Sequence, residues 1–327
     1  MVWSSHLLVL FSFLACFGIK AQKDTFRCPP CASDCHRTDF EESGNCPICN
    51  MPLIKVNQTL FEGYDKKEVM ISNDSILLNA AYYTPKNKNR IKGAMIVVHG
   101  SAPSRYEDMT YYTKIGTKLN MAVLAYDKRG VGKSEGNYQF FNVEESENWF
   151  NLLASDVLAC LSWIKKQPEL QKTKIGLIGG SQAGWIMPLA ASKNKNIDFI
   201  IIGEGVAVSA GEEHYFSQLT GDGDESVNKL SIAEAHLKLQ KFNGTKGFDP
   251  RNILKGLKAK TLWILGTHDP VIPVDATLHE LQSMNNPNFH VQILENGDHN
   301  FNNTQTGKPY NLLEFIEPWL LNNDILN

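Results

Sequence analysis

A serine, an aspartate and a histidine, each following a short apolar run, are the residues of this chain best suited to nucleophilic catalysis. Ser181 lies in the stretch GGSQAG (179–184), and Asp269 and His299 each follow a later apolar run. A serine hydroxyl is a poor nucleophile until a base takes its proton, and histidine can act as that base near neutral pH. An aspartate would hold the imidazole in the required tautomer and stabilise the cation that forms. The order Ser…Asp…His therefore predicts a catalytic triad of Ser181, Asp269 and His299.

The turn that contains the serine suits a nucleophile. The apolar run Ile175–Ile178 precedes it and a helical pattern follows it. A strand-to-helix turn of this kind is so sharp that only small side chains fit two residues on either side of the serine, here Gly179 and Ala183. Taken alone, the motif also fits a plain turn or an anion site at a helix N-terminus. The acid and the histidine that follow later strands favour the nucleophile.

Five of the seven cysteines lie close together near the N-terminus. They include two CxxC pairs, whose thiols belong to Cys28, Cys31, Cys46 and Cys49. Two such turns can place four thiolates around one ion in a closed tetrahedral site. A module of roughly 30 residues buries too little apolar surface to fold alone, so it needs a metal or disulfides. We expect a structural metal site, with Cys35 and His36 as additional or substitute ligands, and disulfide pairing is the alternative.

The second CxxC pair also carries a resemblance. The stretch CPICNMPL (46–53) resembles the end of the small heavy-metal-binding modules attached to bacterial copper and heavy-metal export proteins. Those modules usually begin with Cys-Pro-Met-His, where this chain has CPPC (28–31). The extra thiol favours an all-thiolate site, and hence zinc over copper. The resemblance covers only the cysteine-rich segment.

The first 21 residues have the pattern of an export signal. Leu7–Ile19 is an almost continuous apolar run, too short to span a bilayer but typical of a signal sequence, with a small residue for cleavage at Ala21. The stretch FLAC (13–16) is a weak form of a bacterial lipoprotein box, so lipidation at Cys16 would add a membrane anchor. The alternative is a buried N-terminal strand or helix. We expect an exported protein, periplasmic or secreted.

Strands and helices must position the triad, and their patterns alternate after residue 59. An antiparallel pair is expected over Glu68–Ser72 and Ile76–Tyr83. The short apolar runs that follow are typical of buried parallel strands: Ala94–Val98, Ala122–Tyr126, Lys174–Gly179, Phe199–Ile202, Thr261–Leu265 and His290–Leu294. Helical patterns lie between them, at Tyr111–Leu119, Leu152–Lys166 and Gln182–Ser192. This alternation predicts an α/β fold with a doubly wound, mostly parallel sheet and flanking helices.

These motifs together resemble the α/β-hydrolase fold family over residues 59–327. The stretch VHGS (98–101) is similar to the His-Gly turn after the third strand of that family, and YDKRGVGKS (126–134) is similar to a turn of its esterase-like members. The elbow GGSQAG (179–184), Asp269 and His299 complete the set. We interpret the polar residues of the second turn, Asp127, Arg129 and Ser134, as structural.

The resemblance implies two further features. An oxyanion hole would use the backbone N–H of Gln182 together with that of Ser101 or Ala102, which stabilise charge present only in the transition state. A lid-like insert would occupy residues 206–257, where the strand rhythm is interrupted. We expect residues 22–58 to form the cysteine-rich module and residues 59–327 the hydrolase domain.

Composition limits the remaining possibilities. The chain has 327 residues, a net charge of −3 and no run of like charges, which argues against nucleic acid as a partner. No stretch reaches 18 apolar residues, which excludes a polytopic membrane protein. The sequence thus predicts an exported serine hydrolase of small-molecule carboxylic esters that needs no cofactor for catalysis. A serine aminopeptidase, a thioesterase, and a metal-handling protein with a degenerate hydrolase domain are the alternatives, and the oligomeric state is not predicted.

Overall fold

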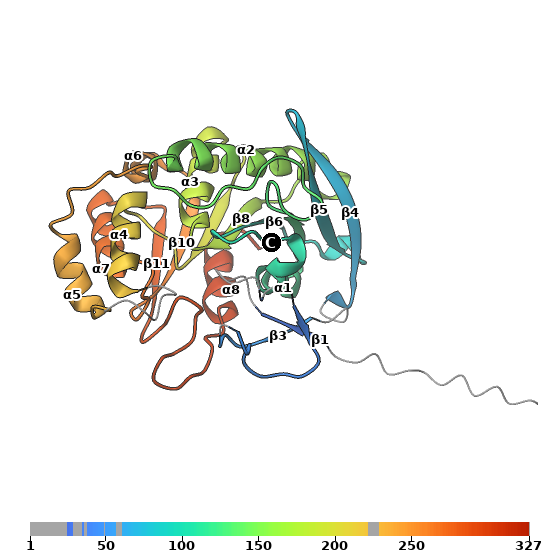
Figure 1. The fold of residues 1–327 in the computed structure, drawn as a ribbon. Coiled ribbons are helices and arrows are strands. Elements are labelled where there is room, and N and C mark those ends of the chain that lie inside the picture. Colours follow the sequence, from blue (N-terminus) through green and yellow to red (C-terminus); the bar gives the residue numbers. More distant parts are fainter. Residues whose placement is uncertain are drawn as a thin grey trace, which may run out of the picture.

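A mostly parallel eight-stranded sheet forms the centre of the molecule (Figure 1). The computed structural model describes residues 25–28, 35, 38–48, 50–56, 61–221 and 229–326. The strand order is β11-β10-β9-β8-β6-β7-β5-β4, with only β4 and β5 antiparallel to their neighbours. The strands are β4 (Tyr64–Asn73), β5 (Ile76–Pro85), β6 (Ala94–Val98), β7 (Ala122–Tyr126), β8 (Ile175–Gly180), β9 (Phe199–Gly203), β10 (Lys260–Gly266) and β11 (Phe289–Leu294). This arrangement confirms the predicted fold class.

Helices cover both faces of this sheet, which is why its central strands are continuous apolar runs. Every residue of β6, β7, β8 and β9 is buried. One apolar core joins the sheet to α2 (Ser146–Ile164), α3 (Ala183–Lys193), α6 (Arg251–Gly256) and α7 (Val274–Met284). The other joins it to α1 (Thr110–Lys118) and α8 (Leu313–Asn322), as Figure 1 shows on the opposite side of the sheet.

The predicted parallel strands agree with the structure to within about a residue. The antiparallel pair is longer than predicted, because β4 begins at Tyr64 rather than Glu68 and β5 ends at Pro85 rather than Tyr83. One helix also begins earlier than predicted. Helix α2 begins at Ser146, six residues before the predicted Leu152. Its first turns contain Trp149 and Phe150, which are buried, and the Phe150 ring stacks on Trp185 of α3 with centroids 5.1 Å apart. Tertiary packing therefore extends the helix through residues of modest helix propensity.

The region predicted as a lid-like insert is largely helical. It contains α4 (Ala210–Thr220), α5 (Ile232–Leu239) and α6, while residues 222–228 lie outside the described part. Ser209 and Ser231 cap α4 and α5 through capping boxes. Phe216 is fully buried against Leu239, so this aromatic ring holds the two helices of the insert together.

A small sheet precedes the main domain. Strands β1 (Thr25–Arg27), β2 (Asp39–Phe40) and β3 (Ile54–Val56) pair in the order β2-β1-β3. Figure 1 shows β1 and β3 beside the end of the molecule that carries α1 and α8. The expected signal sequence, including Cys16 and Ala21, lies outside the described residues. Among the described helices, none is long and apolar enough to cross a membrane.

Candidate active site

Ser181 occupies a strained turn between β8 and α3. Its φ of 55° is in the left-handed region, which non-glycine residues rarely adopt. Its N–H donates to the carbonyl oxygens of Gly203 and Glu204, both at 3.0 Å, which fixes the turn to the end of β9. A Cβ on Gly179 would lie 2.3 Å from the Val98 oxygen and 2.9 Å from the Ala183 Cβ. The small residues flanking the serine are thus required by close approach, as the sequence predicts for a nucleophile elbow.

His299 and Asp269 lie at the same edge of the sheet, in the loops after β11 and β10. Their side chains pair directly, with His299 Nδ1 2.8 Å from Asp269 Oδ2. Asp269 is buried, and its other oxygen accepts from the N–H groups of Val271 and Ile272 at 2.7 and 2.9 Å. The His299 side chain is 24% exposed. A fixed carboxylate on Nδ1 leaves Nε2 as the ring atom available for proton transfer.

The His-Gly turn after β6 comes close to the serine. A Cβ on Gly100 would lie 3.6 Å from the Ser181 Cβ. His99 is buried with its Nε2 2.6 Å from the Tyr126 oxygen, and burial, together with the nearby Lys128 charge, lowers the pKa of His99 to about 3. A neutral His99 therefore donates this hydrogen bond and ties the turn to β7.

The backbone N–H groups of three residues near Ser181 have no hydrogen-bond acceptor among the described residues. Within the described residues, the N–H groups of Ser101, Ala102 and Gln182 donate no hydrogen bond. They are the groups that the sequence predicts for the oxyanion hole. Unengaged N–H groups near a nucleophile can receive the negative charge that develops on a carbonyl oxygen in acyl transfer.

A buried carboxyl lies behind the histidine–aspartate pair. Glu204 follows β9 with φ 43° and is 1% exposed, and its Oε2 accepts from the Gly266 N–H at 3.0 Å. Burial raises the pKa of Glu204 well above its usual range, and the nearby Asp269 raises it further. A hydrogen bond between the Glu204 and Asp269 side chains requires a shared proton, because two ionised carboxylates cannot hydrogen-bond. Burial beside Asp269 therefore favours the protonated form of Glu204.

Comparison with known proteins agrees with this geometry. The profile of the prolyl oligopeptidase family matches residues 108–323, about two thirds of the chain. The chain belongs to this family. The match includes Ser181, Asp269 and His299. A search of curated proteins found no match.

Solved structures with a similar fold include esterases and a peptidase. An esterase of Pyrococcus furiosus, Pf2001, aligns with a TM-score of 0.58 and 19% identity over 87% of this chain and 96% of the esterase. Est1E of Butyrivibrio proteoclasticus, whose structure has ferulic acid bound, aligns with a TM-score of 0.54 and 18% identity. The alignment covers 78% of this chain and 98% of Est1E. The acylaminoacyl peptidase of Pyrococcus horikoshii aligns with a TM-score of 0.53 and 15% identity over 79% of this chain but 41% of the peptidase. At these identities the likeness shows the fold, and this member of the prolyl oligopeptidase family is a hydrolase of the α/β-hydrolase fold.

The loop after β7 contains a lysine that the sequence analysis did not single out. Lys128 is 1% exposed, and its Nζ donates to the carbonyl oxygens of Gly100, Ser101 and Ala102 at 2.7, 3.0 and 3.4 Å. It also donates to Gln182 Oε1 at 3.2 Å. Burial lowers the pKa of Lys128 to about 7. No local signal distinguishes this lysine from a solvated one in a charged turn.

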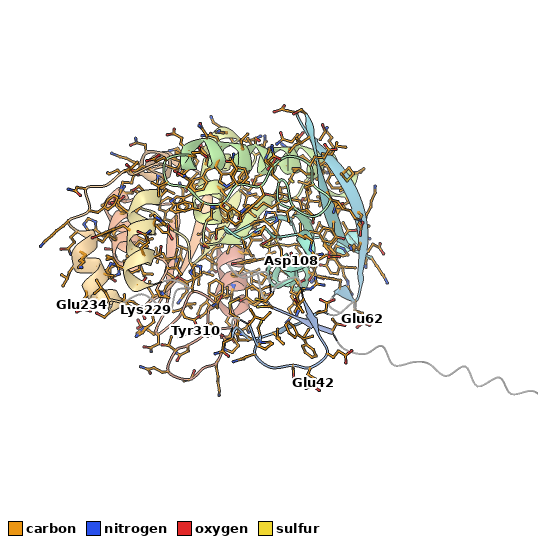
Figure 2. All side chains as sticks on the ribbon, in the orientation of Figure 1. Glu42, Glu62, Asp108, Lys229, Glu234 and Tyr310 are labelled. Carbon is orange, nitrogen blue, oxygen red and sulfur yellow. The ribbon has the colours of Figure 1, made fainter. Side chains whose placement is uncertain are left out.

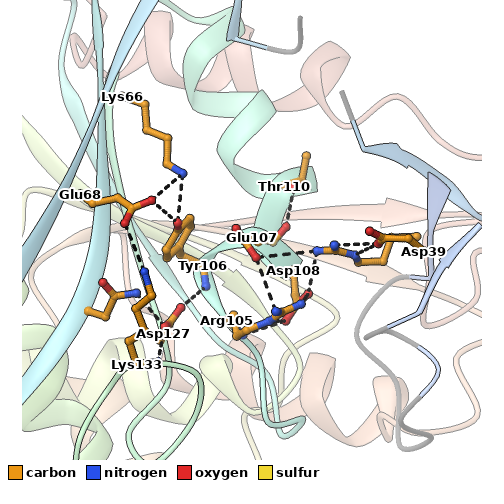
Figure 3. A network of polar contacts seen from close by, with 12 residues as sticks. Asp39, Lys66, Glu68, Arg105, Tyr106, Glu107, Asp108, Thr110, Asp127 and Lys133 are labelled. Carbon is orange, nitrogen blue, oxygen red and sulfur yellow. Dashed lines mark hydrogen bonds and ion pairs between the residues drawn. The ribbon is translucent and has the colours of Figure 1, made fainter. Parts of the chain in front are cut away.

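The polar residues of the same loop anchor it to neighbouring elements, and Figure 3 shows this for Asp127. Asp127 accepts from the Tyr106 N–H at 2.9 Å and from Asn79 Nδ2 at 2.8 Å. Arg129 pairs with the buried Asp156 through Nη2 and Nε at 2.6 and 3.1 Å. The Ser134 hydroxyl donates to the Asp127 carbonyl oxygen at 2.7 Å. These contacts agree with a structural function for Asp127, Arg129 and Ser134.

The cysteine-rich segment brings three thiols together. The sulfur atoms of Cys28, Cys35 and Cys46 all lie within 4.8 Å of one another, and all three residues are buried. Cys31 and Cys49, the other predicted ligands, lie outside the described residues, as does His36. Three converging buried thiols fit a thiolate metal site, with Cys35 in the position of a substitute ligand.

Proposed function

We propose that the chain hydrolyses carboxylic esters through a Ser181–His299–Asp269 triad. Ser181 Oγ attacks the ester carbonyl carbon while His299 Nε2 takes the hydroxyl proton. The tetrahedral intermediate collapses, the carbon–oxygen bond to the leaving alcohol breaks, and His299 returns the proton to that alcohol. Water then attacks the acyl-enzyme with His299 again as base, which releases the carboxylic acid and restores Ser181.

The pairing of His299 with Asp269 at 2.8 Å, at the sheet edge where Ser181 occupies its strained turn, carries this proposal. The open N–H groups of Ser101, Ala102 and Gln182 supply the remaining requirement of acyl transfer, a site for the oxyanion.

An ester is favoured over a peptide by the structural neighbours. The alignment covers 96% of Pf2001 and 98% of Est1E, but 41% of the acylaminoacyl peptidase. The family name instead points to a peptidase, so a serine aminopeptidase is the second candidate, and a thioesterase would use the same triad. A binding protein with a degenerate hydrolase domain is the candidate from another class.

A fluorophosphonate probe and a substrate panel test the proposal. Wild-type protein should react covalently with the probe and hydrolyse 4-nitrophenyl esters faster than aminoacyl 4-nitroanilides. Ser181→Ala and His299→Ala should each lower ester turnover by ~10⁴-fold or more, and the double variant should lose little more, because the residues act as a unit. Turnover above a tenth of wild type in Ser181→Ala would exclude Ser181 as the nucleophile. If the protein reacts with the probe but hydrolyses anilides or thioesters faster than esters, that compound class becomes the proposed substrate.

We also propose that the cysteine cluster holds one structural zinc ion. Cys28, Cys35 and Cys46 supply three thiolates, and Cys31 and Cys49 are the further candidates from the CxxC pairs. Zinc would fold the module and supply no step of ester hydrolysis, because the triad needs no metal.

Export remains the proposal for localisation. It rests on the apolar run Leu7–Ile19 and the small residue Ala21. N-terminal sequencing of the mature protein should begin at Gln22, whereas a lipidated N-terminus would begin at Cys16.

A further inference from the structure

We infer that Lys128 is a positioning residue that holds both halves of the oxyanion hole in their active geometry. The inference rests on the proposed function, and it assigns a task to a buried cation that the triad does not use. Its Nζ contacts three successive carbonyl oxygens of the His-Gly turn and one side chain at the start of α3.

Peptide geometry links these contacts to the oxyanion donors. In a planar trans peptide the C=O and the next N–H point in opposite directions, and the described chain contains no cis peptide bond. The oxygen of Gly100 shares its peptide with the Ser101 N–H, and the oxygen of Ser101 shares its peptide with the Ala102 N–H. Drawing both oxygens toward Nζ therefore directs both N–H groups away from Lys128. Tyr138 reinforces the same orientation, because its hydroxyl donates to the Ser101 oxygen at 2.7 Å.

The fourth contact reaches the other side of the hole. Lys128 Nζ lies 3.2 Å from Oε1 of Gln182, the residue that follows the serine and caps α3. The backbone N–H of Gln182 is the second predicted donor. The Lys128 amino group thus joins the turn after β6 to the elbow after β8. Burial lowers its pKa, and the four oxygen acceptors around Nζ favour the protonated form against this effect.

A lysine in the same loop provides a matched control. Lys133 is five residues away, its side chain is 73% exposed, and its Nζ pairs with Glu68 at 3.6 Å on the surface. Lys133→Met removes the same charge and the same donors without touching the His-Gly turn. Lys128→Met removes the buried ammonium with similar volume, and Lys128→Gln keeps two donors without the charge.

The experiment compares these variants with wild type in ester turnover, fluorophosphonate labelling and inhibition by phenylboronic acid. Phenylboronic acid forms a tetrahedral adduct with a serine hydroxyl and places an oxygen in the oxyanion hole, so it reports on that site in the way of a transition-state analogue. Active sites are counted by the covalent label, and thermal unfolding is measured on the same samples. Lys128→Met should lower kcat per labelled site by roughly 10- to 100-fold, as expected for displaced oxyanion donors. Its phenylboronic acid affinity should fall by a similar factor while KM changes little.

Lys128→Gln should fall between Lys128→Met and wild type, and Lys133→Met should match wild type. If Lys128→Met does not fold, Lys128→Gln decides by the same two measurements. A merely structural lysine would lower the unfolding temperature or the number of labelled sites, and leave kcat per site and boronic acid affinity unchanged. That result would overturn this inference alone. Wild-type protein that neither labels nor turns over esters would overturn the proposed function, and this inference with it.

Discussion

At the scale of single residues, a buried carboxyl that favours its protonated form lies beside Asp269, the acid of the proposed triad. Glu204 is buried behind Asp269 and anchored to the Gly266 N–H. Its pKa is raised, chiefly by burial and then by Asp269, so it holds its proton at pH values where a free glutamate has lost it. The folded state therefore binds a proton that the unfolded state releases.

Replacing this acid should change how stability depends on pH. For a group whose folded pKa is raised, its contribution to stability is complete at low pH and is lost as pH rises toward the folded pKa. Glu204→Gln keeps a donor toward Asp269 and an acceptor for the Gly266 N–H without the titrating proton. We expect the free energy of unfolding of Glu204→Gln, relative to wild type, to increase as pH rises above about 4.5. Urea unfolding between pH 4 and 9 measures it.

Glu317→Gln, on the exposed side of α8, controls for the loss of one negative charge. A constant difference between Glu204→Gln and wild type across this pH range would mean that Glu204 titrates as an ordinary carboxyl.

The site residues differ in how far the sequence could predict them. Ser181, Asp269 and His299 each follow an apolar strand, so a local pattern places them at one sheet edge. The position of Lys128 depends instead on acceptors 26 to 54 positions away along the chain. Such contacts cannot be predicted from the residues that neighbour Lys128 in the sequence.

At the scale of elements, the elbow depends on close approach between β8, β6 and the start of α3. A Cβ on Gly179 would meet the Val98 oxygen at 2.3 Å and the Ala183 Cβ at 2.9 Å. The first contact is with backbone in a central strand, which has little freedom to shift. Gly179→Ala should therefore destabilise the fold by at least about 3 kcal/mol, the upper range for overpacking.

Thermal or urea unfolding checks this, with Gly256→Ala of α6 as the control. A Cβ on Gly256 would meet nothing within 4 Å, so this change should be neutral or stabilising by about 0.5–1 kcal/mol. Adding Ala183→Gly to Gly179→Ala should not restore stability, because the contact with the Val98 oxygen remains. Recovery in that double variant would show that the two Cβ atoms alone make the turn tight.

The elements themselves were predictable where burial makes the pattern. Strands β6 and β7 have the predicted bounds because apolar residues fill both faces between polar turns. Helix α2 was predicted too short because Trp149 and Phe150 gain their helical packing from α3, which is distant in sequence. Periodicity over a window of neighbours does not contain that contact.

At the scale of the whole molecule, an arginine of the cysteine-rich module forms ion pairs with the main domain. Arg27 of β1 pairs with Asp39 of β2 at 2.7 Å, and reaches Asp108 and Glu107 at 3.7 and 4.0 Å. These acids belong to η4 (Tyr106–Met109), which lies between the His-Gly turn and α1. Figure 3 shows this bridge, and Figure 2 shows Asp108 in the main domain with Glu42 at the far side of the module. The module is therefore docked beside the loop that leads from the active site.

We expect the active site to work without the docking contact. Asp108 is held independently by Arg105, whose backbone N–H donates to Oδ2 at 2.8 Å and whose Nε lies 3.4 Å from the same oxygen. Release of Arg27 thus leaves Asp108 with a partner and η4 with its cap. We expect loss of the module's fold to leave ester hydrolysis within a few-fold of wild type.

Removing one thiol of the cluster tests the metal and this independence together. Elemental analysis of wild-type protein should find about one zinc ion per chain. Cys35→Ala should lose this ion, because three converging thiolates become two. Cys160→Ala, which removes a thiol buried in α2 within the main core, should keep the ion. Both variants should retain ester turnover. If Cys35→Ala keeps its zinc, the ligands are the four cysteines of the two CxxC pairs alone. If mass spectrometry finds disulfides in the wild-type protein and elemental analysis finds no zinc, the cysteines form covalent links and not a metal site. If folded Cys35→Ala loses ester turnover but Cys160→Ala keeps it, unfolding of the module affects the His-Gly turn through Arg27 and η4.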